Sequence, residues 1–190
     1  MDLRAYYEEA LTPEAFQVLM TEEQRKLHSL HGRRAEIDPE AVETLRGKGP
    51  RRVLVITEPW CGDSLAIFPV VLALFGGAGC AVRIVRRDEH TELIDQYLTN
   101  GGRAIPIVLL LDDAYAVRLR WGPRPGPAQQ IVDAHREDVK AGRIDKAEVH
   151  KKVRAFYSSD KGKTIVAELV AAWETRIPRL IRPSGLEASR

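Results

Sequence analysis

The spacing of apolar positions divides the chain into helical and extended segments. In the first fifty residues apolar side chains recur three or four positions apart, which is typical of helices. This repeat runs through Leu11, Ala15, Val18 and Leu19. Thr12-Pro13 makes a favourable helix start, residues 22–31 form a second, charged stretch, and residues 38–46 form a third that Asp38 opens as its cap. We expect these N-terminal helices to pack their apolar stripes against the rest of the protein.

Apolar, β-branched runs after residue 50 predict buried strands. Residues 53–57 (VLVIT) are apolar throughout, as in a strand that is covered on both faces. Residues 64–75 (SLAIFPVVLALF) are long enough for a buried helix, which Pro69 should kink. Residues 80–87 then predict a second strand, and residues 91–98 a second helix.

The last part of the pattern predicts a hairpin and more helices. Residues 105–111 and 115–121 are extended runs joined by a short turn. Helical stretches follow at 128–141, 145–157 and 163–175. A β-α-β unit followed by an antiparallel hairpin implies an α/β fold with a mixed central sheet flanked by helices.

This order of elements gives the domain organisation that we expect. Residues 1–49 form an N-terminal helical extension that packs on the core, and residues 50–125 form the core itself. Residues 126–178 supply C-terminal helices that complete the domain, and residues 179–190 form a tail.

Composition narrows the class of protein. Of 190 residues, 44% are hydrophobic and 29% charged, as in a globular domain. The 29 basic and 27 acidic residues leave a net charge of +2, so we expect no nucleic-acid partner. No run approaches the roughly 18 apolar residues of a membrane span, and the acidic N-terminus is unlike a secretory signal. We therefore expect a cytoplasmic protein without a membrane partner.

The cysteine count excludes a disulfide scaffold. Cys61 and Cys80 are the two cysteines, and they do not form a CxxC pair. The five histidines show no zinc-ligand spacing. We expect no metal and no bound cofactor.

The stretch TEPWCGDS (57–64) carries the candidate chemistry. Cys61 falls where the predicted strand ends and a helix begins, and the unpaired N–H groups of a helix N-terminus favour an anion such as a thiolate. Gly62 would allow a tight turn and the approach of another chain. Ser64 can cap the helix or donate a hydrogen bond to the sulfur, whereas the charge of Asp63 opposes a thiolate. We expect Cys61 to be a reactive thiol at the surface.

Four features in this order resemble the thioredoxin superfamily. Trp60-Cys61-Gly62 matches the start of the WCGxC motif, and Pro69 matches the proline of the active-site helix. Ile105-Pro106 matches the cis-proline and the residue before it, and Gly122 matches a late glycine. Within the superfamily, the motifs WCGDS, LTNGGRAIP and WGPRP resemble a bacterial thioredoxin-like family of poorly defined function.

The resemblance implies roles for particular residues. Pro106 would be cis and face Cys61, the backbone of Ile105 would pair with an extended substrate chain, and Trp60 would form part of the docking surface. Catalysis would then involve Cys61, Ser64 and Pro106. Substrate binding would involve Trp60, Gly62, Asp63 and Ile105.

Charged residues near these motifs are candidates for a supporting role. Arg103 and Arg124 flank the proline segment, and either guanidinium would favour a thiolate or hold a carboxylate of a small thiol. Glu58 is the nearest carboxylate and a candidate base. The cluster RRDEH (86–90) is better interpreted as a solvated loop than as a catalytic group.

Two departures from the superfamily pattern bear on the chemistry. Ser64 replaces the resolving cysteine, so a mixed disulfide cannot be released within the molecule. Val55 stands where thioredoxins usually carry a buried acid. We expect Cys80, at the start of the next strand, to be buried and not to act as a resolving thiol.

These observations favour a monothiol (CxxS) thiol–disulfide oxidoreductase. It would form mixed disulfides with protein or small-molecule thiols and disulfides, and an external thiol would release them. A binding module that keeps the fold without turnover is the alternative. A monothiol glutaredoxin-like protein, which would hold an iron–sulfur cluster with glutathione, is a third interpretation that Trp60, Pro69 and the absence of a Gly-Gly-Asp signature argue against.

Overall fold

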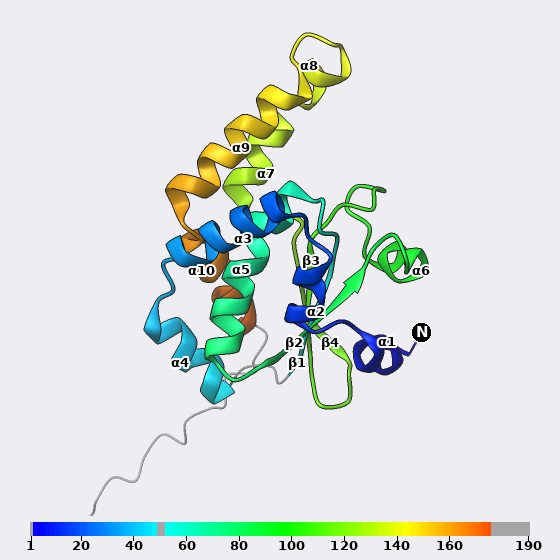
Figure 1. The fold of residues 1–190 in the computed structure, drawn as a ribbon, viewed down its shortest axis with the longest axis vertical. Helices are drawn as coiled ribbons and strands as arrows, with labels where there is room; N and C mark the ends of the chain where they lie inside the picture. The colour runs from blue at the N-terminus through cyan, green and yellow to red at the C-terminus, as the bar shows by residue number, and fades with distance from the viewer. Residues whose placement is uncertain (1, 49–51, 176–190) are drawn as a thin grey trace, which may run out of the picture.

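A mixed four-stranded sheet forms the centre of the protein (Figure 1). We describe residues 2–48 and 52–175 of a computed structural model. The strands are β1 (Arg52–Thr57), β2 (Ala81–Arg86), β3 (Ile107–Leu111) and β4 (Val117–Trp121), in the order β2-β1-β3-β4. Strand β2 runs parallel to β1, whereas β3 is antiparallel to both β1 and β4. The predicted α/β fold with a mixed sheet is confirmed.

The central strand β1 is buried on both faces because helices cover both sides of the sheet. Side chains alternate along a strand, so Val53 and Val55 face one side, and Leu54 and Ile56 face the other. All four are inaccessible to solvent. This two-sided burial explains why the strand reads as a continuous apolar run instead of an alternating one.

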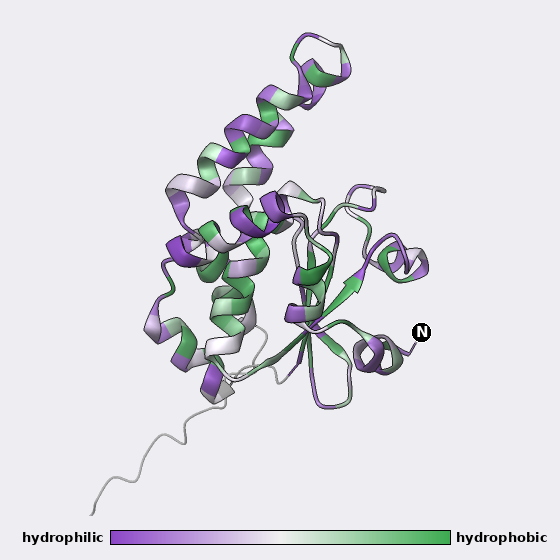
Figure 2. Ribbon diagram, viewed as in Figure 1, coloured by the Kyte–Doolittle hydropathy of each residue, from purple (hydrophilic) through white to green (hydrophobic). Residues whose placement is uncertain are grey.

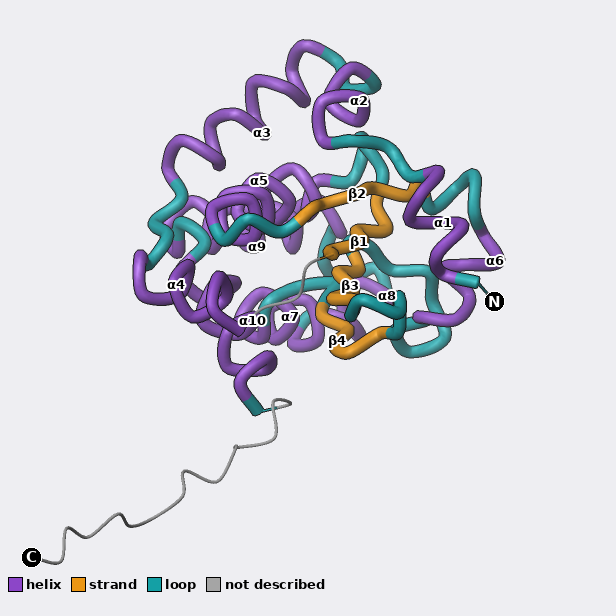
Figure 3. Tube along the Cα trace, turned by 90° about the horizontal axis from the view of Figure 1, so that it is seen from below, coloured by secondary structure: helices purple, strands orange, loops and turns teal. Residues whose placement is uncertain are grey.

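Helix α5 (Gly62–Gly77) lies at the centre of the larger layer (Figure 3). It is covered by α3 (Glu22–Arg34), α4 (Pro39–Lys48) and α10 (Lys163–Glu174). Since neighbours surround it, α5 is apolar on nearly every side. Its Phe68 is fully buried, and the Phe68 ring meets the ring of Phe16 edge-on at 5.5 Å between centroids.

The opposite face of the sheet carries a thinner layer. Helices α1 (Leu3–Glu9) and α6 (Thr91–Ile94), followed by the 3₁₀ turn η1 (Asp95–Tyr97), lie on this side (Figure 3). The Tyr7 hydroxyl on α1 donates a hydrogen bond to the carbonyl of Ala81, at 2.8 Å. The predicted helix 91–98 is thus a short α-helix continued by a 3₁₀ turn.

The C-terminal helices form an arm beside the core. Helices α7 (Gly126–Ala134) and α9 (Lys146–Asp160) run side by side, and α8 (Arg136–Lys140) lies at the far end (Figure 1). Figure 2 shows that this far end is largely hydrophilic, whereas the strands and α5 are hydrophobic. The end of α9 nearer the core contributes Val153 and Tyr157 to the buried cluster around α5.

One predicted apolar face is wrong. Helix α2 (Pro13–Val18) has Ala15 on its surface, Val18 is 77% exposed and Leu19 is 46% exposed. Phe16 and Met20 are buried instead, four positions apart. A six-residue helix buries only one narrow stripe, and the bulkier Phe16 determines which stripe faces the core.

Several domain boundaries that we expected fall outside the described residues. The break at residues 49–50 and the whole tail 179–190 lie there. In the part of the chain that the structure describes, no helix is both long and apolar enough to cross a membrane.

Candidate thiol site

Cys61 is the cap residue of α5. Residues 58–60 form a tight turn after β1, closed by a hydrogen bond from the Cys61 N–H to the Glu58 carbonyl at 3.2 Å. The Cys61 carbonyl then accepts the first helical hydrogen bond, from the N–H of Leu65 at 3.1 Å. The cysteine therefore stands at the N-terminus of a 16-residue helix, as the motif predicts.

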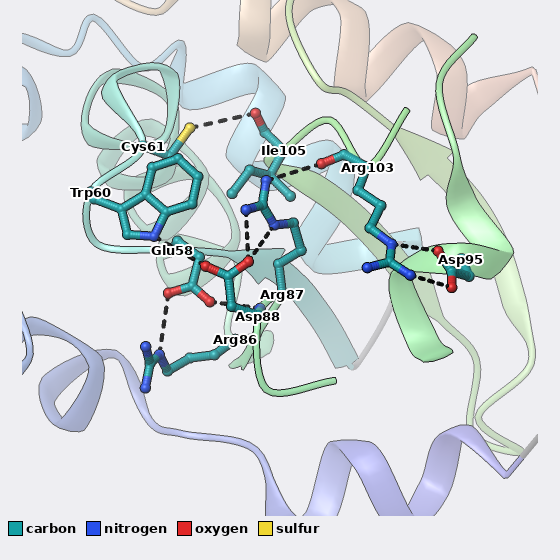
Figure 4. A network of polar contacts seen from close by, with 9 residues as sticks. All are labelled: Glu58, Trp60, Cys61, Arg86, Arg87, Asp88, Asp95, Arg103 and Ile105. Carbon is teal, nitrogen blue, oxygen red and sulfur yellow. Dashed lines mark hydrogen bonds and ion pairs between the residues drawn. The ribbon is translucent and has the colours of Figure 1, made fainter. Parts of the chain in front are cut away.

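The sulfur faces the segment that precedes β3 (Figure 4). Cys61 Sγ lies 3.5 Å from the carbonyl oxygen of Ile105, to which the thiol donates. The peptide bond between Ile105 and Pro106 is cis. Antiparallel pairing of Ile56 with Ile107 brings this segment to the end of β1, and Ile105 itself lies beyond the last paired residue.

Gly122 supports the proline segment from behind. Its φ angle is +110°, and a Cβ atom added there would lie 2.3 Å from the carbonyl oxygen of Pro106. Only glycine fits such a conformation and such a close approach. The following Gly122–Pro123 bond is also cis, so a second cis bond lies behind the proline segment.

The Cys61 side chain is less accessible than we expected. The residue is 7% exposed and belongs to the apolar cluster on the α1 side of the sheet, so the expectation of a surface thiol is wrong. Burial raises the pKa of the thiol, the hydrogen bond from Ser64 lowers it, and the charge of Asp63 raises it. Desolvation is the largest of these effects, so the neutral thiol predominates at pH 7.

Ser64 lies beneath the sulfur, one turn into α5. It is buried, and its hydroxyl shares a hydrogen bond with the hydroxyl of Thr57, the last residue of β1. Hydrogen bonding from the side chain and the backbone of Ser64 lowers the pKa of the Cys61 thiol. Ser64 thus occupies the position of the missing resolving cysteine.

Asp63 does not face an open substrate surface. Its carboxylate forms an ion pair with Arg124, at 2.6 Å between Oδ2 and Nη2, and accepts a hydrogen bond from the Tyr157 hydroxyl at 2.9 Å. Arg124 follows β4, and Tyr157 lies on α9. The C-terminal arm is thus tied to the second residue after the cysteine.

Trp60 is the most exposed side chain next to the cysteine, with 54% of its surface accessible. The guanidinium of Arg87 lies over its ring at 4.7 Å, and the indole N–H donates to Asp88 at 3.3 Å (Figure 4). The loop 86–90 is therefore built into the surface around Trp60 and is not simply solvated.

Glu58 holds this loop in place. Its carboxylate is fully buried, bonds to the Arg86 guanidinium at 3.2 Å and accepts the backbone N–H of Asp88 at 2.8 Å (Figure 4). Both oxygens are engaged on the side away from the sulfur, which does not suit the role of a base acting on Cys61.

Two other candidates lie away from the thiol. The guanidinium of Arg103 binds Asp95 through two hydrogen bonds of 2.6 and 2.7 Å and is turned away from Cys61 (Figure 4). Cys80 is buried just beyond the C-terminal end of α5, whereas Cys61 caps its N-terminus, and a helix of 16 residues is about 24 Å long. Cys80 therefore cannot resolve a disulfide at Cys61 directly.

Gly62 differs from its expected role. Its φ angle is not in the left-handed region, and an added Cβ would meet no atom within 4 Å. The turn does not require glycine here. The open space in front of Gly62 remains consistent with a chain approaching the sulfur.

Two residues of the site escaped the sequence analysis. Thr57 ends a strand, and only its polar side chain in an apolar run marks it. Tyr157 lies on an apolar helical stripe, and nothing in the sequence places it near Asp63. Among the residues that the structure describes, no three histidine, cysteine or acidic side chains gather as metal ligands.

The site and the sheet together define a thioredoxin-like protein. The sequence model of the thioredoxin family matches residues 10–140, more than half of the chain. The chain therefore belongs to the thioredoxin family. The match begins in the N-terminal helices and so extends beyond the region 50–125 in which the motifs lie.

Solved structures support the same fold. The protein of unknown function PA1234 from Pseudomonas aeruginosa superposes with a TM-score of 0.70 at 18% identity, over 92% of this chain and 98% of that one. An HIV epitope scaffold gives a TM-score of 0.66 at 17% identity, over 92% and 99%. At such low identity the likeness shows the fold alone. No curated protein matches the chain.

Proposed function

We propose that this protein catalyses thiol–disulfide exchange through the single thiol of Cys61. The observation that carries this proposal is the position of the sulfur, at the N-terminus of α5 and 3.5 Å from the carbonyl of Ile105. There the helix dipole and the hydrogen bonds from Ser64 stabilise a thiolate once it forms.

The exchange has two steps. The Cys61 thiolate attacks one sulfur of a disulfide, so that a mixed disulfide forms and the other sulfur leaves as a thiolate. An external thiolate then attacks the substrate sulfur of the mixed disulfide, and Cys61 leaves as a thiolate. The second step must be intermolecular because Ser64 has no sulfur to offer. A small-molecule thiol of the bacterial cytoplasm is the reductant we propose.

The surface around the sulfur favours an extended peptide or a small disulfide as substrate. Trp60 offers an exposed aromatic face, and Gly62 leaves open space beside the sulfur. Ile105 lies beyond the paired part of β3, so its backbone can pair with a docked chain. Trp60, Gly62, Ile105 and Pro106 would then form the docking surface.

Burial gives the proposal a characteristic pH dependence. Because the pKa of Cys61 is raised, the thiolate fraction at pH 7 is small and grows as the pH rises toward that pKa. Exchange should therefore be slow at neutral pH and accelerate in alkaline solution.

Incubation with oxidised glutathione and measurement of the intact mass test the proposal. We expect one glutathione adduct on the wild type and on the Cys80→Ser variant, but none on Cys61→Ser. Reduced glutathione should remove the adduct. A wild-type protein that gains no adduct at any pH between neutral and alkaline would overturn the proposal.

The burial of Cys61 favours one other function, a binding module that uses the same surface without turnover. A thiol that is 7% exposed with a raised pKa reacts slowly, which a binding protein would tolerate. Partners captured equally well by the wild type and by Cys61→Ser would favour binding. Partners that a reductant releases from the wild type alone would favour exchange.

A further inference from the structure

Asp63 is the charged residue nearest to Cys61 along the chain, and the partners of its carboxylate lie outside the sheet. Asp63 lies two residues after Cys61, and its side chain is only 13% exposed. Arg124 pairs with one carboxylate oxygen at 2.6 Å, and the Tyr157 hydroxyl donates to the other at 2.9 Å. Tyr157 is itself 3% exposed, so this cluster is largely sealed from water.

The carboxylate of Asp63 affects the thiol directly. Its charge raises the pKa of Cys61, because a carboxylate and a thiolate that lie near each other repel. A carboxylate that is neutralised by a cation and a hydrogen-bond donor repels less. The partners of Asp63 therefore influence how readily the sulfur ionises.

Several elements near the sulfur contribute charged or titratable groups to this balance. Helix α5 supplies Asp63, the segment after β4 supplies Arg124, and α9 supplies Tyr157 and His150. The charge of Asp63 acts on His150, whose pKa burial lowers overall. Glu58 follows β1, and its carboxylate is turned toward the loop 86–90 instead.

Arg124 is held by Asp63 in spite of an imperfect environment. Its Nη1 donates to Gln129 at 3.3 Å, while its buried Nε has no hydrogen-bond partner among the described residues. A buried donor without a partner costs free energy. The guanidinium nevertheless stays beside the site because the ion pair with Asp63 holds it there.

We infer that Arg124 and Tyr157 are positioning residues, which hold the Asp63 carboxylate and so set the ionisation of the Cys61 thiol. This inference rests on the exchange proposed above. It gives the C-terminal arm a function beyond completing the fold, because α9 influences the ionisation of the Cys61 thiol through Asp63.

The pH midpoint of Cys61 alkylation tests the inference. Iodoacetamide is applied across a pH series, and modification is read on the peptide that contains Cys61. We expect Asp63→Asn to lower the midpoint and Arg124→Gln to raise it, each by about one pH unit. The double variant should return toward the wild-type midpoint. Arg124→Lys should stay near the wild type because it keeps the charge.

Tyr157→Phe tests the hydrogen bond without removing the ring. It should raise the midpoint by less than Arg124→Gln does, since the ion pair remains. An ion pair of the same kind at the far end of the arm, between Arg143 and Asp138 at 2.6 Å, supplies the control. Arg143→Gln and Asp138→Asn should leave the midpoint unchanged.

The outcomes separate the inference from the proposed function. If Asp63→Asn and Arg124→Gln change only the melting temperature and share the midpoint of Arg143→Gln, the cluster is merely structural and the inference fails. Alkylation needs no disulfide substrate. Shifted midpoints in a protein that never forms a mixed disulfide would therefore support the inference while rejecting exchange.

Discussion

Replacing Gly122 with alanine should damage the support of the proline segment. The new Cβ would lie 2.3 Å from the Pro106 carbonyl oxygen, about 1 Å inside ordinary van der Waals contact, and also 3.4 Å from Ile107 Cα. The obstacle is backbone, so no side-chain rotation relieves it. Either β4 or the segment 105–107 must move.

The cost can be estimated from two contributions. Holding a residue other than glycine at a φ angle of +110° costs about 1–3 kcal/mol. Overpacking that forces the backbone to shift costs about 1–3 kcal/mol more. We expect a loss of about 4 kcal/mol of unfolding free energy, which lowers the urea midpoint by about 2 M at a slope of about 2 kcal/mol per M.

Urea unfolding followed by tryptophan fluorescence measures this loss. Gly76→Ala is the matched control because Gly76 lies within α5, has an ordinary φ angle and has no atom within 4 Å of an added Cβ. That variant should gain about 0.5–1 kcal/mol from helix propensity. If Gly122→Ala unfolds at the wild-type urea concentration, the argument that Gly122 is sterically required is refuted.

Three further changes test the packing and electrostatics of the core. Glu58→Ala should cost about 3 kcal/mol in urea unfolding because it removes the buried partner of Arg86 and the acceptor of the Asp88 N–H, whereas removing the exposed partner Glu89 should cost at most about 1 kcal/mol; equal costs would contradict the role of Glu58. Phe68→Ala should cost about 4 kcal/mol, and a loss below about 1 kcal/mol would refute its central place in the core. Burial lowers the pKa of His28 to about 4, so the unfolded chain takes up a proton from about pH 6.5 downward while the folded one does not. Stability should therefore fall by up to about 3 kcal/mol between pH 6.5 and 4, and His28→Leu should remove that part of the slope; identical slopes would contradict it.

The sequence predicts the sheet well because its signals are local. The run 53–56 is apolar at every position, which follows from coverage of β1 on both faces. The cap at Asp38 and the hairpin after residue 105 depend on neighbouring residues alone, and both form as predicted. The buried face of helix α2 was predicted wrongly because it depends on a distant residue. Phe68 packs against Phe16 and so determines which side of α2 faces the core.

Residue spacing alone predicts the site only within the motif at residues 60–64, whereas the approach of Ile105 and Pro106 to Cys61 was predicted from the resemblance to the thioredoxin superfamily. Trp60, Cys61 and Ser64 are adjacent in the chain, so their proximity follows from the strand–helix junction. The contact between Asp63 and Tyr157 joins residues 94 positions apart, and no local pattern encodes it. The exposure of Cys61 likewise depends on the packing of distant elements, which is why the expected surface thiol proved to be buried.

Trapping the thiols of the protein inside cells tests the central claim most directly. Cells are challenged with a disulfide-forming oxidant and quenched in acid, free thiols are alkylated, and the Cys61 peptide is identified by mass. If Cys61 carries out exchange, part of the Cys61 population should be linked to a thiol partner by a disulfide that a reductant breaks. Cys80 should carry no such disulfide. A Cys61 that is alkylated completely as a free thiol in every challenged sample would contradict the account.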